Sequence, residues 1–221
     1  MSQVFDCSDN ANLIGAARAA RQAIGRGELV VTPTDTVYGV AADAFSPEAV
    51  QRLLDAKGRG RQSPPPVLIP STDTLVALAS EVVPPVSALA DAFWPGPLTI
   101  VLTAQASLSW DLGDTHGTVA LRIPNHDLTL ELLRETGPLA VSSANTTGDP
   151  AARNLEQAQA MLGDSIAVYL DAGELPGDGT ASTIVDGTRL TAEGGSLRIL
   201  REGGISREAI LEVLPQVTIE D

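Results

Sequence analysis

The polar residues that could carry chemistry lie in four places of this chain, the last of them a pair of segments. They read TPTDTVYG (32–39), KGRGRQS (57–63), SSANTTG (142–148), and ASTIVD (181–186) with LREGG (200–204). A packed domain does not need so many hydroxyl, amide and guanidinium groups. Thr, Ser, Asn and Gly that follow strands present hydroxyls and backbone N–H groups, which bind carboxylates and phosphates. The four places are therefore candidates for one anion-binding site.

Each of these signals has a structural alternative. Thr34, Thr36, Ser143 and Asn145 are residue types that form turns and helix caps more often than they contact ligands. The glycine-rich stretch GDGTAS is typical of a flexible turn. Spacing alone therefore leaves both interpretations open for each residue.

Lys57 is the only lysine of the chain, and together with Arg59 and Arg61 it forms a basic cluster in a protein of net charge -14. Such a local excess of positive charge indicates an anion site. However, the pattern predicts a helix from 47 to about 57, and a cation at a helix C-terminus is also favoured by the helix dipole. That alternative predicts an exposed ammonium.

The small number of histidines and cysteines, and their positions, limit the kinds of site that the chain could form. The two histidines, His116 and His126, lie outside the four places, and Cys7 is the only cysteine. We therefore expect no protein-held metal site and no Cys-His dyad. The chain has no GxxxxGK[ST] sequence, so a bound nucleotide would not use a P-loop.

Composition limits the class of protein. The 221 residues are enough for one large domain with an ample core, and no run reaches the roughly 18 apolar residues of a bilayer span. The first ten residues do not resemble a secretion signal, and one cysteine cannot form an internal disulfide, so we expect a cytoplasmic protein. Because the net charge is -14, large nucleic acids are disfavoured as ligands.

Hydrophobic periodicity predicts alternating helices and strands. Ser46 followed by Pro47 is typical of a helix start. We expect helices at 11–24, 47–57, 72–80, 85–93, 127–135, 154–162 and 207–214. The strands are expected in ELVVTP with the start of TDTVYGVAADAF, and in PVLIP, LTIVLTA, TVALRIP, LAVSSA, IAVYLD, STIVD and LRILR. This alternation predicts an α/β fold with a mixed sheet covered by helices.

The order of several motifs resembles one known family. The motifs are VTPTDTVYGVAADAF, LLDAKGRGRQSP, FWPGPLTIVL, VALRIPNH, AVSSANTTGDPA, ASTIVDGT and LRILREGGI. From about residue 11 to 207 the chain resembles the YrdC/Sua5 family, the L-threonylcarbamoyladenylate synthases. The resemblance implies an open twisted mixed sheet flanked by helices, with a concave, positively lined active-site face. It also implies that residues 1–221 form a single YrdC-like catalytic domain of the short form, without a second C-terminal domain.

The resemblance further implies an activity. L-threonine, bicarbonate and ATP, with Mg²⁺, would form L-threonylcarbamoyl-AMP and pyrophosphate. This is the first step of N6-threonylcarbamoyladenosine formation at position 37 of ANN-decoding tRNAs. Separate proteins of the pathway would transfer the group, so we expect no direct tRNA binding.

Family positions assign roles to individual residues. Lys57 and Arg59 match the pair that engages the ATP phosphates and are the expected catalytic residues. Further ATP contacts are expected at Ser63, Thr118, Ser143, Asn145 and Arg201, and threonine contacts at Thr34, Arg122 and Ser182. The chain departs from the family pattern at Gly60, where proline is usual, at Ser63, where asparagine is common, and at Leu68, where some members have histidine.

Two other functions remain open at this point. One is an RNA-binding or ribosome-maturation factor of the same fold, which would be expected to be more basic. The other is a relative that acts on another carbamoyl compound. The matches at Lys57, Arg59, Ser143, Asn145 and Arg201 favour nucleotide chemistry, and they bear less on the choice of threonine.

Overall fold

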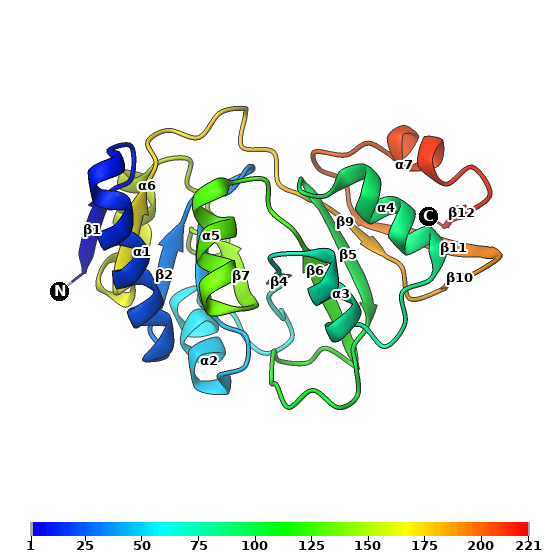
Figure 1. The fold of residues 1–221 in the computed structure, drawn as a ribbon, viewed down its shortest axis with the longest axis horizontal. Helices are drawn as coiled ribbons and strands as arrows, with labels where there is room; N and C mark the ends of the chain where they lie inside the picture. The colour runs from blue at the N-terminus through cyan, green and yellow to red at the C-terminus, as the bar shows by residue number, and fades with distance from the viewer. Residues whose placement is uncertain (1, 221) are drawn as a thin grey trace.

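The strands of the computed structural model, which describes residues 2–220, form one continuous mixed sheet. Their order is β1-β8-β2-β3-β7-β4-β6-β5-β9-β11-β10, with β12 paired to β11. The sheet runs from β1 on the left of Figure 1 to β10 and β12 on the right. The strands are β1 (Gln3–Asp6), β2 (Val30–Thr32), β3 (Gly39–Asp43), β4 (Val67–Leu68), β5 (Leu98–Thr103), β6 (Thr118–Arg122), β7 (Leu139–Ser143), β8 (Val168–Asp171), β9 (Thr183–Asp186), β10 (Leu190–Thr191), β11 (Gly194–Arg201) and β12 (Thr218–Glu220).

Four of the helices in the described residues begin at a side-chain cap. Asp9, Ser46, Asn154 and Ser206 each accept a backbone N–H in the first turn of the helix that follows. The helices are α1 (Asn10–Gly25), α2 (Pro47–Ala56), α3 (Thr72–Leu78), α4 (Pro84–Phe93), α5 (Asp127–Thr136), α6 (Leu155–Leu162) and α7 (Arg207–Val213), with a 3-10 turn η1 (Gly163–Ser165). The predicted helices are thus confirmed to within two residues at each end. Between residues 2 and 220, none combines the length and apolar composition of a bilayer span.

Strand directions confirm the predicted mixed sheet. β5 pairs antiparallel with β6 and parallel with β9. β3 pairs antiparallel with both β2 and β7, whereas β4 runs parallel to β6. Short strands β1, β10 and β12, which the sequence pattern did not predict, extend the two ends of the sheet.

Helices cover the two halves of the sheet differently. Around β2, β3 and β8, helices α1 and α5 pack on one face and α2 and α6 on the other. Around β5, β6, β9 and β11, helices α3, α4 and α7 contribute to one apolar cluster on a single face (Figure 1). Within residues 2–220, none of these three helices packs against the second face of this half.

Alternation along the strands gives this second face its polar character. Leu98, Ile100 and Leu121 point into the apolar cluster. Successive strand residues point to opposite faces, so Thr99 and Arg122 lie on the other side. Both line a cleft there.

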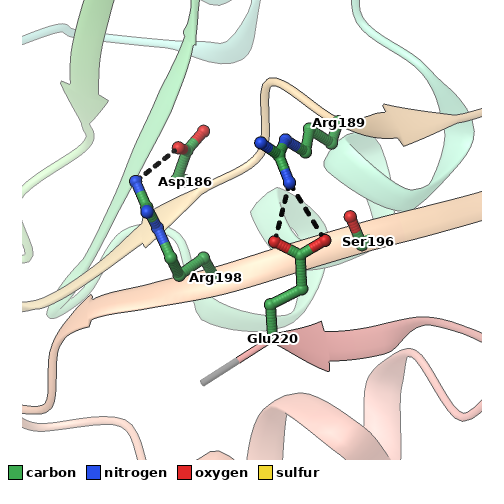
Figure 2. Close-up of a pocket in the computed structure, with 5 residues that line it drawn as sticks. All are labelled: Asp186, Arg189, Ser196, Arg198 and Glu220. Atoms are coloured by element: carbon green, nitrogen blue, oxygen red, sulfur yellow. Dashed lines mark hydrogen bonds and ion pairs between the residues drawn. The ribbon is translucent and has the colours of Figure 1, made fainter.

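A charged crevice lies at the end of the sheet that β10 and β12 form, between β9, β10, β11 and β12 (Figure 2). Arg189 contacts Glu220 at 2.9 Å, and Arg198 contacts Asp186 at 3.4 Å. The crevice is lined by Asp186, Arg189, Ser196, Arg198 and Glu220. Because its two cations are paired with its two carboxylates, the crevice offers no excess charge to a ligand. Exposed pairs of this kind contribute little to stability.

Candidate active site

A cleft of about 260 Å³ opens on the face of the sheet that carries Thr99 and Arg122. Its wall combines hydroxyl groups, three guanidinium groups and an apolar patch. It is lined by Thr34, Thr36, Val37, Gly39, Arg59, Pro64, Pro66, Leu68, Thr99, Arg122, Val141, Ser142, Ser143, Ala151, Ala181, Ser182, Ile184 and Arg201. The structure therefore brings the four polar places of the sequence together around one cavity.

Two guanidinium groups of the cleft have no carboxylate partner within the described residues. Arg59 donates from Nε to Thr147 Oγ1 (3.1 Å) and from Nη1 to Ser142 Oγ (3.3 Å). Arg201, at the end of β11, donates to the backbone oxygen of Ser182 from Nε (3.0 Å) and Nη2 (2.8 Å). Burial, and next the charge of Arg59, lower the pKa of Arg201. Two such cations in one partly desolvated cleft favour a bound anion.

The Lys57 ammonium lies beneath the cleft and is fully buried. Lys57 is the C-cap of α2, and its Nζ donates to the backbone oxygens of Ser143 and Asn145 and to Asn145 Oδ1 (2.7 Å). Burial, and next the charge of Arg59, lower the pKa of Lys57 to about 7. The helix-end alternative, which predicts an exposed ammonium, is wrong.

Lys57, Ser143 and Asn145 form one polar network. Asn145 Oδ1 accepts from Ser143 Oγ (2.5 Å), and Asn145 Nδ2 donates to the backbone oxygen of Asp149 (2.6 Å). An ammonium has three hydrogens, and four oxygens already surround it, because Ser143 Oγ also lies 3.5 Å from Nζ. Lys57 would therefore have to exchange a protein contact to reach a phosphate. Ser143 lines the cleft, whereas Lys57 and Asn145 lie behind it. Their roles toward ATP stay predictions.

Thr34 lines the cleft and also forms hydrogen bonds within a turn. Its Oγ1 accepts the backbone N–H groups of Thr36 and Val37, both at 3.2 Å, and donates to the backbone oxygen of Val37 at 2.7 Å. The turn-forming interpretation of Thr34 is therefore confirmed. Its contact with threonine stays a prediction.

Thr99 is a cleft residue that sequence reasoning missed. It is 1% exposed on β5, and its Oγ1 lies 2.9 Å from Ser182 Oγ. Ser182 Oγ also accepts from Arg201 Nη2 at 3.1 Å. A threonine in the apolar strand LTIVLT gives no functional signal by itself. Only its alternation with Leu98 and Ile100 could have placed it on the cleft face.

Arg122 ends β6 and is 6% exposed. It pairs with Asp35, whose Oδ1 lies 2.5 Å from Arg122 Nη2, in a partly buried setting where the two side chains are 8% and 13% exposed. Burial lowers the pKa of Arg122, and Asp35 opposes that shift. Arginine stays protonated at physiological pH in proteins, so the cleft keeps a third cation.

Two glycines permit close contacts at the cleft. A Cβ on Gly39 would lie 2.6 Å from Val141 Cγ1, and a Cβ on Gly203 would lie 2.2 Å from the backbone oxygen of Ala181. Gly203 follows Arg201 by two residues. Its missing side chain therefore lets the turn after β11 pass directly against the backbone that carries Ser182.

Two predicted ATP contacts do not line the cleft. The backbone N–H of Ser63 donates to the backbone oxygen of Gly60 at 3.1 Å. Thr118 begins β6, and its Oγ1 donates to the backbone oxygen of Thr115 at 2.8 Å. Arg122 ends the same strand, about 13 Å away at the usual rise per residue. The structure does not bring Thr118 into the cavity, and the ATP roles of both residues stay predictions.

Arg61 differs from Arg59 although they are two residues apart. Its Nη2 lies 2.7 Å from Asp111 Oδ1, and its Nε lies 3.6 Å from Asp114 Oδ1. These side chains are about half exposed. Only part of the basic cluster is therefore directed to the cleft.

The donor set of the cleft suits phosphates better than a protein-held metal. Residues 2–220 contain no group of three or more His, Cys, Asp or Glu side chains arranged to hold a metal ion. Mg²⁺ usually keeps several waters and binds substrate phosphates with few protein ligands. The cleft itself presents hydroxyl and guanidinium groups, which are donors to anions.

Comparisons with known sequences show what this chain is similar to. The Sua5/YciO/YrdC family profile, described as telomere recombination, matches residues 22–203. A protein of Mycobacterium tuberculosis strain H37Rv, provisionally named threonylcarbamoyl-AMP synthase, is 51% identical over 97% of this chain and 96% of its own. The threonylcarbamoyl-AMP synthase of Pyrococcus abyssi is 35% identical over 91% of this chain and 58% of its own.

Solved structures share the whole fold. A variant of Pyrococcus abyssi Sua5 superposes with a TM-score of 0.90 at 32% identity, and the complex of that protein with L-threonine with a TM-score of 0.84. Both cover 100% of this chain, which spans only 62% of theirs. Escherichia coli YciO, at 19% identity and a TM-score of 0.79, shares the fold. With its profile match, its half-identical relatives and its shared architecture, this chain belongs to the Sua5/YciO/YrdC family.

Proposed function

We propose that this protein synthesises L-threonylcarbamoyl-AMP from L-threonine, bicarbonate and ATP, with release of pyrophosphate. The observation that carries the proposal is the set of three guanidinium groups, from Arg59, Arg122 and Arg201, around one cleft. Relatives that match nearly the whole chain carry the name of this enzyme. A related protein has been solved with L-threonine.

The chemistry requires that two anions meet. The threonine amine and bicarbonate form a carbamate with loss of water. A carbamate oxygen then forms a bond to the α-phosphorus of ATP, the bond from that phosphorus to the bridging oxygen breaks, and pyrophosphate leaves. Arg59 and Arg201 would hold the phosphates and stabilise the charge of the transition state, because neither has a carboxylate partner among residues 2–220.

The threonine side of the cleft would be read by hydroxyls and by Arg122. An arginine can bind a carboxylate through two parallel hydrogen bonds. Ser182 and Thr99 present neighbouring hydroxyls to the same cavity. Val141, Leu68 and Ile184 supply the apolar part of the wall.

We also propose that Mg²⁺ enters as MgATP and that the reaction takes place in the cytoplasm. The product is a mixed anhydride and reacts with water, so a separate transfer protein must receive it promptly. That protein would attach the threonylcarbamoyl group to adenosine 37 of ANN-decoding tRNAs.

The test is a product assay with purified protein, ATP, Mg²⁺, bicarbonate and one amino acid at a time. Pyrophosphate and the carbamoyl adenylate are measured, the latter by mass spectrometry. L-threonine should be the best substrate, and serine should be about fivefold weaker because it lacks a buried methyl group. Equal turnover of alanine and threonine would contradict the proposal. Omission of bicarbonate, or addition of EDTA, should abolish product.

Arg59 and Arg61 offer a matched pair of variants. Arg59→Ala should lower the rate of pyrophosphate formation by at least about 100-fold, because it removes a cation from the developing charge. Arg61→Ala removes the same side chain from a surface ion pair and should stay within about threefold of the wild type. Equal losses in both variants would show that the loop, and not the Arg59 charge, controls the rate.

A further inference from the structure

Asp35 is the one carboxylate that reaches the guanidinium groups of the cleft in the described part of the chain. Its Oδ1 lies 2.5 Å from Arg122 Nη2 and also accepts the backbone N–H of Asn125 at 2.9 Å. The side chain is 13% exposed. Asp35 thus links the turn after β2, the end of β6 and the segment that precedes α5.

The contacts of Arg122 show how the guanidinium is held. Nε donates to the backbone oxygen of Gly96 at 3.0 Å, Nη1 to Thr36 Oγ1 at 3.2 Å, and Nη2 to Asp35 Oδ1. Each nitrogen is therefore fixed by an acceptor from a different position. An arginine has five N–H groups, so one hydrogen on Nη1 and one on Nη2 are left for a ligand. Arg122 lines the cleft, where a carboxylate could accept both.

We propose that Asp35 is a positioning residue for substrate recognition, which fixes the plane of the Arg122 guanidinium for the α-carboxylate of the amino-acid substrate. This inference rests on the proposed function. Two-point recognition needs both Nη atoms at set positions, and Asp35 is the only charged side chain that holds one of them among residues 2–220. The Asn125 contact in turn fixes the carboxylate itself.

A positioning role differs from a role as a counter-charge. If position matters, Asp35→Asn should change the affinity for threonine only slightly, because the amide keeps an oxygen acceptor at the same distance. Asp35→Glu should weaken threonine binding strongly, because it keeps the charge but moves the carboxylate by one methylene. A counter-charge role predicts the reverse order. A purely structural role predicts no change in substrate affinity for any variant that folds.

The experiment measures kcat and the KM values for L-threonine and ATP in Asp35→Asn, Asp35→Glu and Asp35→Ala. We expect KM for threonine to rise at least about tenfold in the Glu and Ala variants. In the Asn variant it should stay within about threefold of the wild-type value. KM for ATP and kcat should stay within about threefold in all three. Asp186→Ala, which removes a carboxylate from the distant Arg198 ion pair, is the control and should resemble the wild type.

Each outcome has a distinct meaning. Folding is checked by circular dichroism, and if one of the Glu and Ala variants does not fold, the other carries the test. An unchanged KM for threonine in a folded Glu or Ala variant, or an equal rise in both KM values, would overturn the positioning role. Failure of both to fold would also overturn it, by assigning Asp35 to stability. Absence of product from the wild type with threonine would instead reject the proposed function.

Discussion

Lys57 combines full burial with a titratable amine next to a cluster of acceptors. Its pKa is lowered to about 7, first by burial and then by Arg59. The acceptor oxygens of the Ser143–Asn145 turn stabilise the ammonium form. Near neutral pH, the protonation of this one amine is therefore coupled to the local geometry of that turn.

This coupling predicts a pH dependence of stability. The unfolded chain holds the Lys57 proton up to about pH 10.5, whereas the folded chain releases it near pH 7. The unfolded state therefore binds more protons between these values, so the free energy of unfolding should rise with pH, by at most about 1.4 kcal/mol per unit. In Lys57→Met this contribution is lost. The difference in unfolding free energy, wild type minus variant, should grow from pH 7 to 9 in urea titrations.

The same titrations contain their own control. Other titrating groups, such as Cys7 with its pKa raised to about 11 by burial, are present in both proteins and cancel in the difference. Below pH 7 the difference should be flat. A difference that stays constant from pH 6 to 9 would show that Lys57 remains an ammonium throughout.

The sequence could predict some site residues and not others. Arg59 and Arg201 lie in motifs with turn residues and clustered charge, so their segments stand out as candidate sites. Thr99 lies in an apolar strand, and Asp35 looks like an ordinary turn residue. Their roles depend on Ser182 and Arg122, which are 83 and 87 residues away in the chain. Contacts over such distances are set by strand order, which local patterns do not reveal.

At the scale of elements, helices were easier to predict than edge strands. Helix starts carry a local signal, as in Ser46 with Pro47. Strands β1, β10 and β12 are two to four residues long and mostly exposed, so they have neither an apolar run nor an alternating pattern. They are held by pairing with longer or more buried neighbours, β8 and β11.

The segment 172–182 crosses from β8 to β9 and joins the two halves of the sheet (Figure 1). Tyr38 OH donates to the backbone oxygen of Gly173 at 2.7 Å and anchors the start of the segment. Arg153 Nη2 donates to the backbone oxygens of Leu175 at 3.0 Å and Gly177 at 2.6 Å. Arg153 lies in the segment between the Ser143–Asn145 turn and α6. Its side chain therefore links this segment to the crossover.

Arg153→Ala should therefore loosen the crossover. Hydrogen bonds to a charged group stabilise by about 1.5–3 kcal/mol, so amide hydrogen exchange in residues 174–180 should become at least about tenfold faster. Arg189→Ala, which breaks the exposed pair with Glu220 in the crevice of Figure 2, should leave these amides unchanged. Unchanged exchange in Arg153→Ala would mean that Tyr38 and the backbone contacts suffice to hold the segment.

At the scale of the whole molecule, the cleft and the surface have opposite charge. Three arginines line the cavity, while the chain as a whole carries a net charge of -14. A small anion contacts only the cleft, whereas a large polyanion must also approach the acidic exterior. The same molecule should therefore accept ATP and repel RNA.

This separation predicts no saturable tRNA binding in filter assays at about 0.1 M salt and about 10 μM protein. The positive control is the binding of an ATP analogue whose bridge between the α- and β-phosphorus cannot be cleaved, measured by calorimetry in the same buffer. Specific retention of tRNA, with an affinity that falls steeply as salt is added, would reveal a basic surface and favour the RNA-binding alternative.

The burial of the only lysine also determines how the native protein responds to proteolysis. An endoprotease that cuts only after lysine has one target in the chain, the bond between Lys57 and Gly58. Since Lys57 is 0% exposed and tied to the Ser143–Asn145 turn, the folded protein should resist cleavage. Cutting into fragments 1–57 and 58–221 then requires that the end of α2 detach from that turn. The cleavage rate therefore measures how often the layer beneath the cleft opens, without any label or mutation.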